Sequence, residues 1–142
     1  MTHNFVVRIL IIAVIMIFSG ACISSCSEMH MKIDDVNVHV QWENSASVNA
    51  LKASLPLSVN MHMYGGFEQV GSLGHNLTRN DKRMTTSAGD IVLYSGNQIV
   101  IFSGSNTWEY TKLGRITGMN ESELRDLLGK SEVTLILSRG ID

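Results

Sequence analysis

The chain has 142 residues, with 11 Lys and Arg against 13 Asp and Glu, so its formal net charge is −2 at neutral pH. This length supports one domain with a hydrophobic core of its own. A nucleic-acid-binding surface needs clustered basic residues, but the densest group, Arg79, Lys82 and Arg83, is interrupted by Asp81. We therefore expect no nucleic acid among its partners.

The first 26 residues have the order of parts found in a signal peptide. A weakly basic start with His3 and Arg8 leads into an uninterrupted apolar run over residues 9–18. The small residues 19–21 follow, as a signal peptidase requires. A membrane-spanning helix needs about 20 apolar residues, more than this run provides. We predict a signal peptide over residues 1–26, with an uncleaved N-terminal anchor as the alternative.

Both cysteines of the chain, Cys22 and Cys26, directly follow this apolar run. Residues 23–26, Ile-Ser-Ser-Cys, resemble the processing site of a bacterial lipoprotein, and residues 18–22 are a looser version of it. Diacylglycerol on Cys26, or alternatively on Cys22, would anchor the protein through acyl chains, at about 0.8 kcal/mol for each buried CH₂. This predicts an extracytoplasmic protein of the bacterial cell envelope, lipid-anchored to the membrane. A disulfide or two unmodified thiols is the alternative.

After a short tether over residues 27–31, residues 32–142 are predicted to form one domain made mainly of β-strands. Apolar and polar residues alternate over residues 36–42, which is typical of a half-buried strand. The predicted strands cover residues 31–33, 36–42, 57–63, 67–73, 90–94, 99–102, 108–117 and 133–137. One predicted helix is capped by Ser45 or Ser47 and stops before Pro56, and the other is capped by Asn120 and covers residues 121–128.

Between these elements, residues 75–89 are polar and charged and are predicted to form a loop. Residues 90–94 and 99–102 are apolar at nearly every position, so this hairpin is predicted to be central in the sheet. In the strand that follows, the alternation slips between Lys112 and Leu113, which indicates a β-bulge.

Two segments carry a resemblance to a known family. Residues 65–71 read Gly-Gly-Phe-Glu-Gln-Val-Gly, and residues 104–114 read Gly-Ser-Asn-Thr-Trp-Glu-Tyr-Thr-Lys-Leu-Gly. With the order of the elements, they resemble the bacterial cyclophilin-like fold proteins over residues 36–138. The resemblance implies a closed cyclophilin-like β-barrel of about eight strands with two short helices, like that of peptidyl-prolyl isomerases. It implies no activity, because that family has none that is settled.

Polar and aromatic residues in these segments and directly after them are the candidate ligand contacts. Glu68 and Gln69 follow a Gly-Gly pair, where the backbone can approach another group closely. Trp108, Tyr110 and Arg115 share the later strand. Together they predict a binding module for a small molecule or a short peptide. Alternatively, Glu68 braces its own turn by accepting backbone N–H groups.

Two other functions compete with a binding module. A peptidyl-prolyl isomerase lowers a barrier of about 18–20 kcal/mol with an arginine that hydrogen-bonds the proline nitrogen. Arg115 is the one suitable candidate, since Arg79 lies in a polar loop and Arg125 on a helix, and Arg115 can equally point into solvent. The Phe-His-Arg signature of true cyclophilins is missing. The third possibility is a structural subunit of an envelope complex.

Two Met-His-Met triplets, residues 29–31 and 61–63, carry the thioether and imidazole groups that suit Cu(I). In a strand, however, Met and His of one triplet point to opposite faces, so the methionines would fill the core instead. No spacing of Cys or His fits a zinc site. We therefore expect neither a metal site nor a cofactor.

Overall fold

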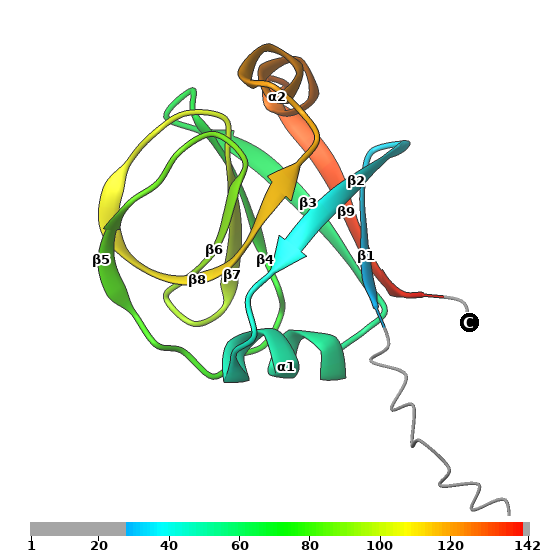
Figure 1. Cartoon of the computed structure of the whole chain (residues 1–142), viewed down its shortest axis with the longest axis vertical. Helices are drawn as coiled ribbons and strands as arrows, with labels where there is room; N and C mark the ends of the chain where they lie inside the picture. The colour runs from blue at the N-terminus through cyan, green and yellow to red at the C-terminus, as the bar shows by residue number, and fades with distance from the viewer. Residues whose placement is uncertain (1–27, 141–142) are drawn as a thin grey trace, which may run out of the picture.

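The computed structural model describes residues 28–140. The predicted signal peptide and both candidate lipidation sites, Cys22 and Cys26, lie outside the described residues. The elements are β1 (Met29–Ile33), β2 (Val36–Trp42), α1 (Ala46–Ala53), β3 (Leu57–Tyr64), β4 (Glu68–Ser72), β5 (Lys82–Thr85), β6 (Asp90–Tyr94), β7 (Gln98–Phe102), β8 (Thr107–Thr117), α2 (Glu121–Leu128) and β9 (Glu132–Arg139) (Figure 1).

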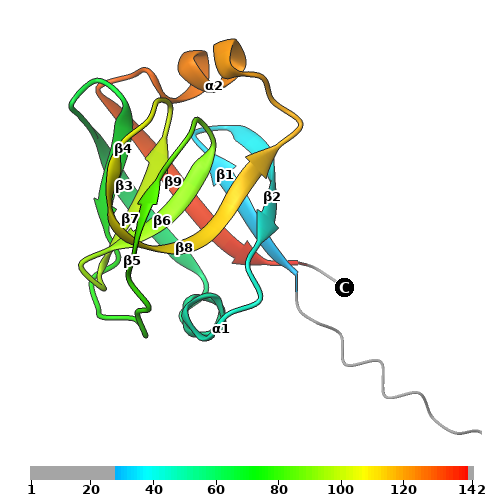
Figure 2. The ribbon, with the colours of Figure 1, turned by 60° about the vertical axis from the view of Figure 1, so that its left-hand side comes forward.

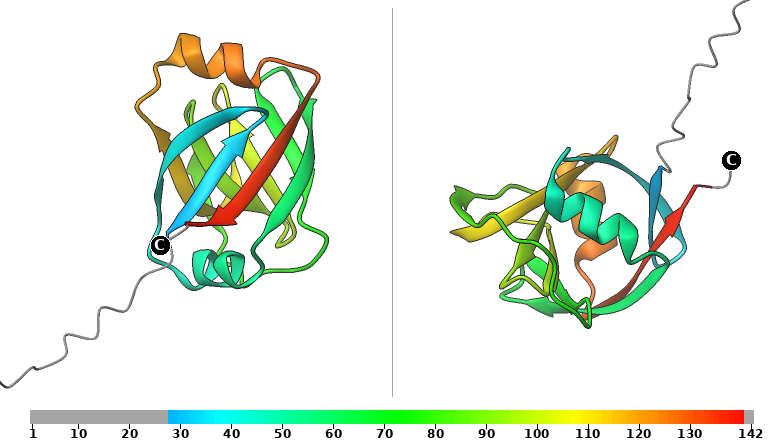
Figure 3. Two further views of the ribbon diagram at one scale, coloured as in Figure 1. Left: turned by 90° about the vertical axis from the view of Figure 1, so that its right-hand side faces the viewer. Right: turned by 90° about the horizontal axis from the view of Figure 1, so that it is seen from below.

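Eight of these strands close into an antiparallel barrel. Neighbouring strands follow the order β2-β1-β9-β3-β4-β7-β6-β8, and residues 114–117 of β8 pair back to residues 39–42 of β2. Figure 3 shows the resulting ring of strands from the side and along its axis. The predicted fold, a closed eight-stranded barrel with two short helices, is therefore confirmed.

The two helices cover opposite ends of the barrel (Figures 2 and 3). α1 begins after Ser45, whose hydroxyl oxygen accepts a hydrogen bond from the Val48 N–H at 3.2 Å, and it buries Val48 and Leu51 in the barrel core. α2 begins after Asn120 in the same way and buries three leucines. Both capping residues are among those predicted. Within residues 28–140, neither helix has the length and apolarity needed to cross a membrane.

The barrel begins earlier than the sequence predicts. Met29, Met31 and Ile33 are buried in β1, which pairs along its whole length with β9. Residues 29–31, predicted as part of the tether, therefore belong to the domain. The polar residues between these apolar positions, such as His30, face outward, so the alternation typical of a strand already begins at Met29.

The predicted loop over residues 75–89 also contains a strand. β5 pairs with residues 107–110 at the start of β8. Its four side chains, Lys-Arg-Met-Thr, are exposed except for a partly buried Met84. β5 lies outside the ring at a sheet edge, so its sequence did not have to alternate between apolar and polar residues.

A bulge divides β8 into two parts. Ile91 and Val92, which are adjacent on β6, pair with Gly114 and Lys112, so Leu113 is one extra residue on β8. This confirms the bulge predicted between Lys112 and Leu113. The second part of β8 closes the barrel on β2, whereas the first part curves away from the barrel together with β5 (Figure 1).

A second apolar cluster lies on the outside of the barrel wall. Val92, Val100, Phe102 and Tyr110 are buried in it, and Met84 of β5 packs against them. The intervening residues of β6 and β7 point into the main core. This hairpin is thus apolar on both faces, as expected for central strands. The outer cluster attaches the layer formed by β5 and the first part of β8 to the wall.

Candidate functional site

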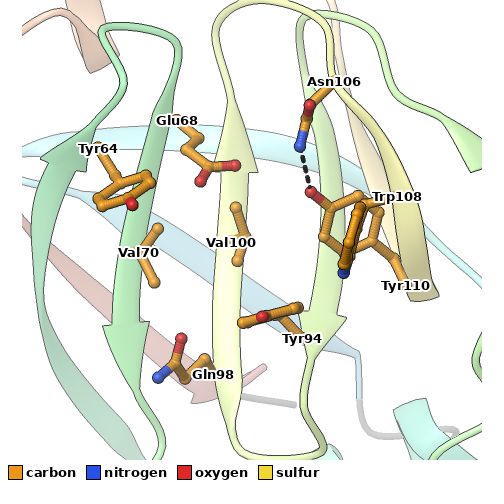
Figure 4. A pocket seen from close by; sticks show the side chains of 9 residues that line it. All are labelled: Tyr64, Glu68, Val70, Tyr94, Gln98, Val100, Asn106, Trp108 and Tyr110. Carbon is orange, nitrogen blue, oxygen red and sulfur yellow. Dashed lines mark hydrogen bonds between the residues drawn. The ribbon is translucent and has the colours of Figure 1, made fainter.

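A groove of about 480 Å³ lies between the barrel wall and the first part of β8. This volume is within the range of about 300–1,000 Å³ that small-molecule sites occupy. We call it the aromatic groove, since four of its nine lining residues are Tyr or Trp. The lining residues are Tyr64, Glu68, Val70, Tyr94, Gln98, Val100, Asn106, Trp108 and Tyr110 (Figure 4).

The turn between β3 and β4 places Tyr64 and Glu68 opposite each other at the groove, where they are cross-strand partners. In this turn Gly65 and Gly66 have φ angles of 65° and 80°, which only glycine adopts without a steric cost. A Cβ atom at Gly65 would also collide with the ring of Phe67. The glycine pair therefore allows the tight turn that brings both side chains to the groove.

Glu68 is the one lining side chain with a formal charge at neutral pH. It is only 8% exposed, and its Oε2 atom has no hydrogen-bond partner among residues 28–140. Burial raises the pKa of Glu68, because removal from water disfavours the ionised form. Figure 4 shows its carboxyl group directed into the groove. A buried carboxyl group without a partner is costly, so Glu68 is a candidate polar anchor for a ligand.

The aromatic wall of the groove is held in a fixed arrangement. The Tyr110 ring makes edge contacts with Tyr94 and Phe102, at centroid distances of 6.1 and 5.6 Å. Its hydroxyl oxygen accepts a hydrogen bond from Asn106 Nδ2 at 2.7 Å. Burial raises the pKa of Tyr110, and the charge of Glu68 adds to this effect. The Tyr110 hydroxyl therefore stays neutral at physiological pH.

Exposed aromatic side chains gather at this groove. Tyr64, Tyr94 and Trp108 are 70%, 37% and 52% exposed, and they are the exposed aromatic residues of the described chain. The other exposed large apolar residues, Val36 and Ile136, lie on β2 and β9, outside the groove. Exposed aromatic surface around a polar group is typical of a binding site.

Three of the five predicted contacts, Glu68, Trp108 and Tyr110, line the groove together. Gln69 does not, because successive residues of a strand point to opposite faces. Its Nε2 atom donates to two backbone carbonyl oxygens at the end of α2 and just beyond it, at 2.9 and 2.7 Å. Gln69 is fully buried and ties β4 to the segment that follows α2.

Arg115 also lies outside the groove. Its Nη1 atom donates to Asp90 Oδ1 at 3.0 Å, and its side chain is 49% exposed. Because β4, β7, β6 and β8 are neighbours in this order, Arg115 and Glu68 are three strand spacings apart, roughly 14 Å along the sheet. Arg115 thus forms a surface ion pair away from the other predicted contacts.

The other six lining residues were not predicted from the sequence. They are Tyr64, Val70, Tyr94, Gln98, Val100 and Asn106. Their meeting depends on strand pairing and on the curvature of β8, neither of which is local in the sequence. One signal was available: Val100 and Phe102 make β7 apolar on its outer face, which implies that another layer covers that face.

A second cavity, of about 370 Å³, lies between α1, β5 and β8. Among residues 28–140, the buried side-chain atoms without a hydrogen-bond partner are Glu68 Oε2 and Gln69 Oε1, and neither lines this cavity. The aromatic groove is therefore the better candidate site.

The two Met-His-Met triplets are strand segments of β1 and β3. Met29, Met31 and Met61 are buried in the main core, while His30 and His62 are exposed. The side chains of each triplet therefore point to different faces, which favours core packing over copper binding. Within residues 28–140, no three His, Cys, Asp or Glu side chains are grouped as a metal site requires.

Comparisons with known proteins agree with this architecture. The sequence pattern of the cyclophilin-like family matches residues 31–136. The fold is similar to the solution structure of a hypothetical protein from Archaeoglobus fulgidus, with a TM-score of 0.57 and 16% sequence identity, over 79% of this chain and 93% of that chain. At this identity the likeness shows the fold alone. A search of curated proteins found no match.

Proposed function

This chain belongs to the cyclophilin-like family, and from that premise we propose that it is a lipid-anchored, extracytoplasmic binding module that takes a small molecule or a short peptide into the aromatic groove. The observation that carries the proposal is the buried Glu68 carboxyl group, whose Oε2 atom lacks a partner inside a groove of about 480 Å³. A ligand that hydrogen-bonds this atom removes the cost of leaving it unpaired.

The geometry of the wall supports binding by a site that is already formed. Asn106 fixes the Tyr110 hydroxyl, and Tyr94 and Phe102 fix its ring. A site whose side chains are ordered in advance loses less conformational entropy when it binds. Trp108 is exposed beside this wall and offers a large apolar surface to an incoming ligand.

An isomerase receives less support from the same geometry. Arg115, the arginine that would assist a proline peptide, donates to Asp90 outside the groove. An assay of cis/trans interconversion on a proline peptide separates the two functions. We expect no acceleration by the wild-type domain, whereas acceleration that Arg115→Ala abolishes would replace the binding module with an isomerase.

The proposed anchor would keep the domain close to the membrane. β1 begins at Met29, three residues after Cys26. Three extended residues span at most about 10 Å. Lipidation of Cys26 would therefore hold the start of the first barrel strand within about 10 Å of the lipid surface.

Thermal unfolding of residues 28–142 tests the binding role. This segment contains both apolar clusters and every element of the closed barrel, so it is a self-contained folding unit. Screened against fractions of an envelope extract, a ligand at one hundred times its Kd should raise Tm by about 10 °C. Trp108→Ala should remove that shift, and Ile136→Ala, which truncates an exposed residue outside the groove, should retain it. Co-purification of one protein partner without any ligand-induced shift would instead favour a structural subunit.

Labelling with a clickable fatty acid tests the anchor. The wild-type full chain should be labelled and Cys26→Ser should not. Loss of label only in Cys22→Ser would move the site to the alternative cysteine. Equal labelling of wild type and both variants would contradict lipidation at either position.

A further inference from the structure

We propose that the ligand of the aromatic groove is a protonated amine attached to an apolar body, with its ammonium group bound to Glu68 and its apolar part against the aromatic wall. This inference rests on the proposed binding function and adds the chemical class of the ligand. It follows from the charge of the groove, from the state of Glu68 and from the nature of the wall.

The charge of the lining disfavours anionic ligands. Of the nine lining residues, Glu68 alone carries a formal charge, and none is Lys, Arg or His. A carboxylate or phosphate ligand would meet a like charge and no counter-charge in the groove. A cation, in contrast, would meet an opposite charge that is largely shielded from water.

The missing hydrogen-bond partner of Glu68 favours a cation that carries N–H groups. Oε2 is buried and lacks a hydrogen-bond partner among residues 28–140. A protonated amine supplies both the donor and the opposite charge. Such charge-assisted bonds are about twice as strong as bonds between neutral groups. A quaternary ammonium ion offers the charge without the hydrogen bond, and a neutral alcohol offers the hydrogen bond without the charge.

The aromatic residues on the two sides of the groove suit the same class. Tyr64 stands on one side of the Glu68 carboxyl group, and Trp108 and Tyr110 stand on the other (Figure 4). Faces of Trp and Tyr attract cations through the ring quadrupole, and more strongly where the cation is removed from water.

The apolar lining and the volume require a ligand larger than ammonium itself. Val70 and Val100 lie between the aromatic residues of the two sides, below the Glu68 carboxyl group (Figure 4). Their side chains offer an apolar surface, and about 480 Å³ leaves room for a ring or an alkyl chain. Gln98 at the far end supplies a neutral polar group for the rest of the ligand.

Calorimetric titration of residues 28–142 with matched probes tests the proposal. The probes are phenylethylammonium, its neutral analogue phenylethanol and its anionic analogue phenylpropionate, each at up to millimolar concentration. N-acetyl-lysine methylamide represents a lysine in a peptide, so its affinity relative to phenylethylammonium distinguishes a peptide source from a free amine. We expect phenylethylammonium to bind about ten- to a hundredfold more tightly than the alcohol, and the anion not to bind.

Two variants assign this preference to Glu68. Glu68→Gln should reduce affinity for phenylethylammonium by about ten- to a hundredfold and bring it close to that for the alcohol. Glu109→Gln removes the same charge from an exposed position between Trp108 and Tyr110 on β8 and should leave both affinities unchanged.

The titrations can contradict the amine proposal and the binding function separately. The amine proposal is wrong if no ammonium probe binds, if the alcohol or the anion binds as tightly as the amine, or if Glu68→Gln has no effect on amine affinity. The proposed binding function fails separately, when no component of an envelope extract of any charge binds in a manner sensitive to Trp108→Ala.

Discussion

Replacing Glu68 by Gln should stabilise the folded domain in the absence of a ligand, and only above the pKa of this residue. Burial raises the pKa of Glu68 above its ordinary value of 4.5. At a pH between the ordinary pKa, which holds in the unfolded chain, and the raised pKa of the folded chain, the folded chain therefore binds more protons than the unfolded chain. The free energy of unfolding then falls as pH rises through this window, and above it the folded state carries the cost of a buried, unpaired charge. Gln keeps the shape of the side chain and removes the charge.

The magnitude follows from the surroundings of the carboxyl group. Glu68 is 8% exposed and its Oε2 atom has no partner among residues 28–140. Leaving a buried polar group unpaired costs about 1–3 kcal/mol. The Gln side chain remains polar, so we expect the variant to recover only the lower part of this range, about 1 kcal/mol. For a domain of about 100 residues that corresponds to a rise in Tm of about 4 °C at pH 8.

Thermal unfolding of the wild type and Glu68→Gln at pH 8 and at pH 4 measures this effect. At pH 4 the folded-state carboxyl group is already protonated, so the two proteins should unfold at nearly the same temperature. Glu109→Gln, an exposed control on β8, should change stability by less than about 0.5 kcal/mol at either pH. Destabilisation by Glu68→Gln at pH 8, or the same gain at both pH values, would refute the argument that Glu68 is a destabilising buried charge.

Two further predictions concern the barrel and its outer layer. At Gly71 a Cβ atom would lie 2.5 Å from Val59 Cγ1 inside the core. Gly71→Ala should therefore lower the free energy of unfolding by about 1–3 kcal/mol, as measured by chemical denaturation. An unchanged denaturation midpoint would contradict this close packing. Asp81 accepts hydrogen bonds from Arg79 and from the Thr111 hydroxyl, and these, the one from Arg79 foremost, lower its pKa. The ionised Asp81 therefore adds to the free energy of unfolding above its ordinary pKa, and this stabilisation is lost as the pH falls through the lowered pKa of the folded state. Asp81→Asn should destabilise the domain by about 1 kcal/mol at pH 7 and by progressively less in acid, as measured by Tm at a series of pH values. An effect that is the same at every pH would show that the charge of Asp81 is not involved.

Most of the fold could be predicted because its signals are local. Alternation along β2, the caps Ser45 and Asn120, and the slip between Lys112 and Leu113 each depend on a few neighbouring residues. β5 could not be predicted in this way. It is an exposed, polar strand whose existence depends on the distant first part of β8.

The candidate site could be predicted only where its residues are marked by local sequence. Glu68 follows a glycine turn, and Trp108 and Tyr110 lie two residues apart on one strand, so the sequence singles out these three lining residues of the groove. Gln69 could have been rejected, because strand alternation already places it on the opposite face from Glu68. Tyr94 and the other residues contributed by strand pairing needed the three-dimensional register.

The most direct test of the central claim is the fluorescence of Trp108. The chain has two tryptophans, and Trp42→Phe leaves Trp108 in the groove as the sole reporter. Trp42 donates a hydrogen bond to a backbone oxygen at 3.1 Å and packs, partly buried, against the main core, so the variant should lose about 1–3 kcal/mol of stability.

In this background, titration with phenylethylammonium should change the Trp108 emission saturably, and the added substitution Glu68→Gln should move the midpoint to at least about tenfold higher concentration. Emission that stays constant, while calorimetry of the same protein records binding, would place the ligand elsewhere and contradict the assignment of the aromatic groove as the binding site.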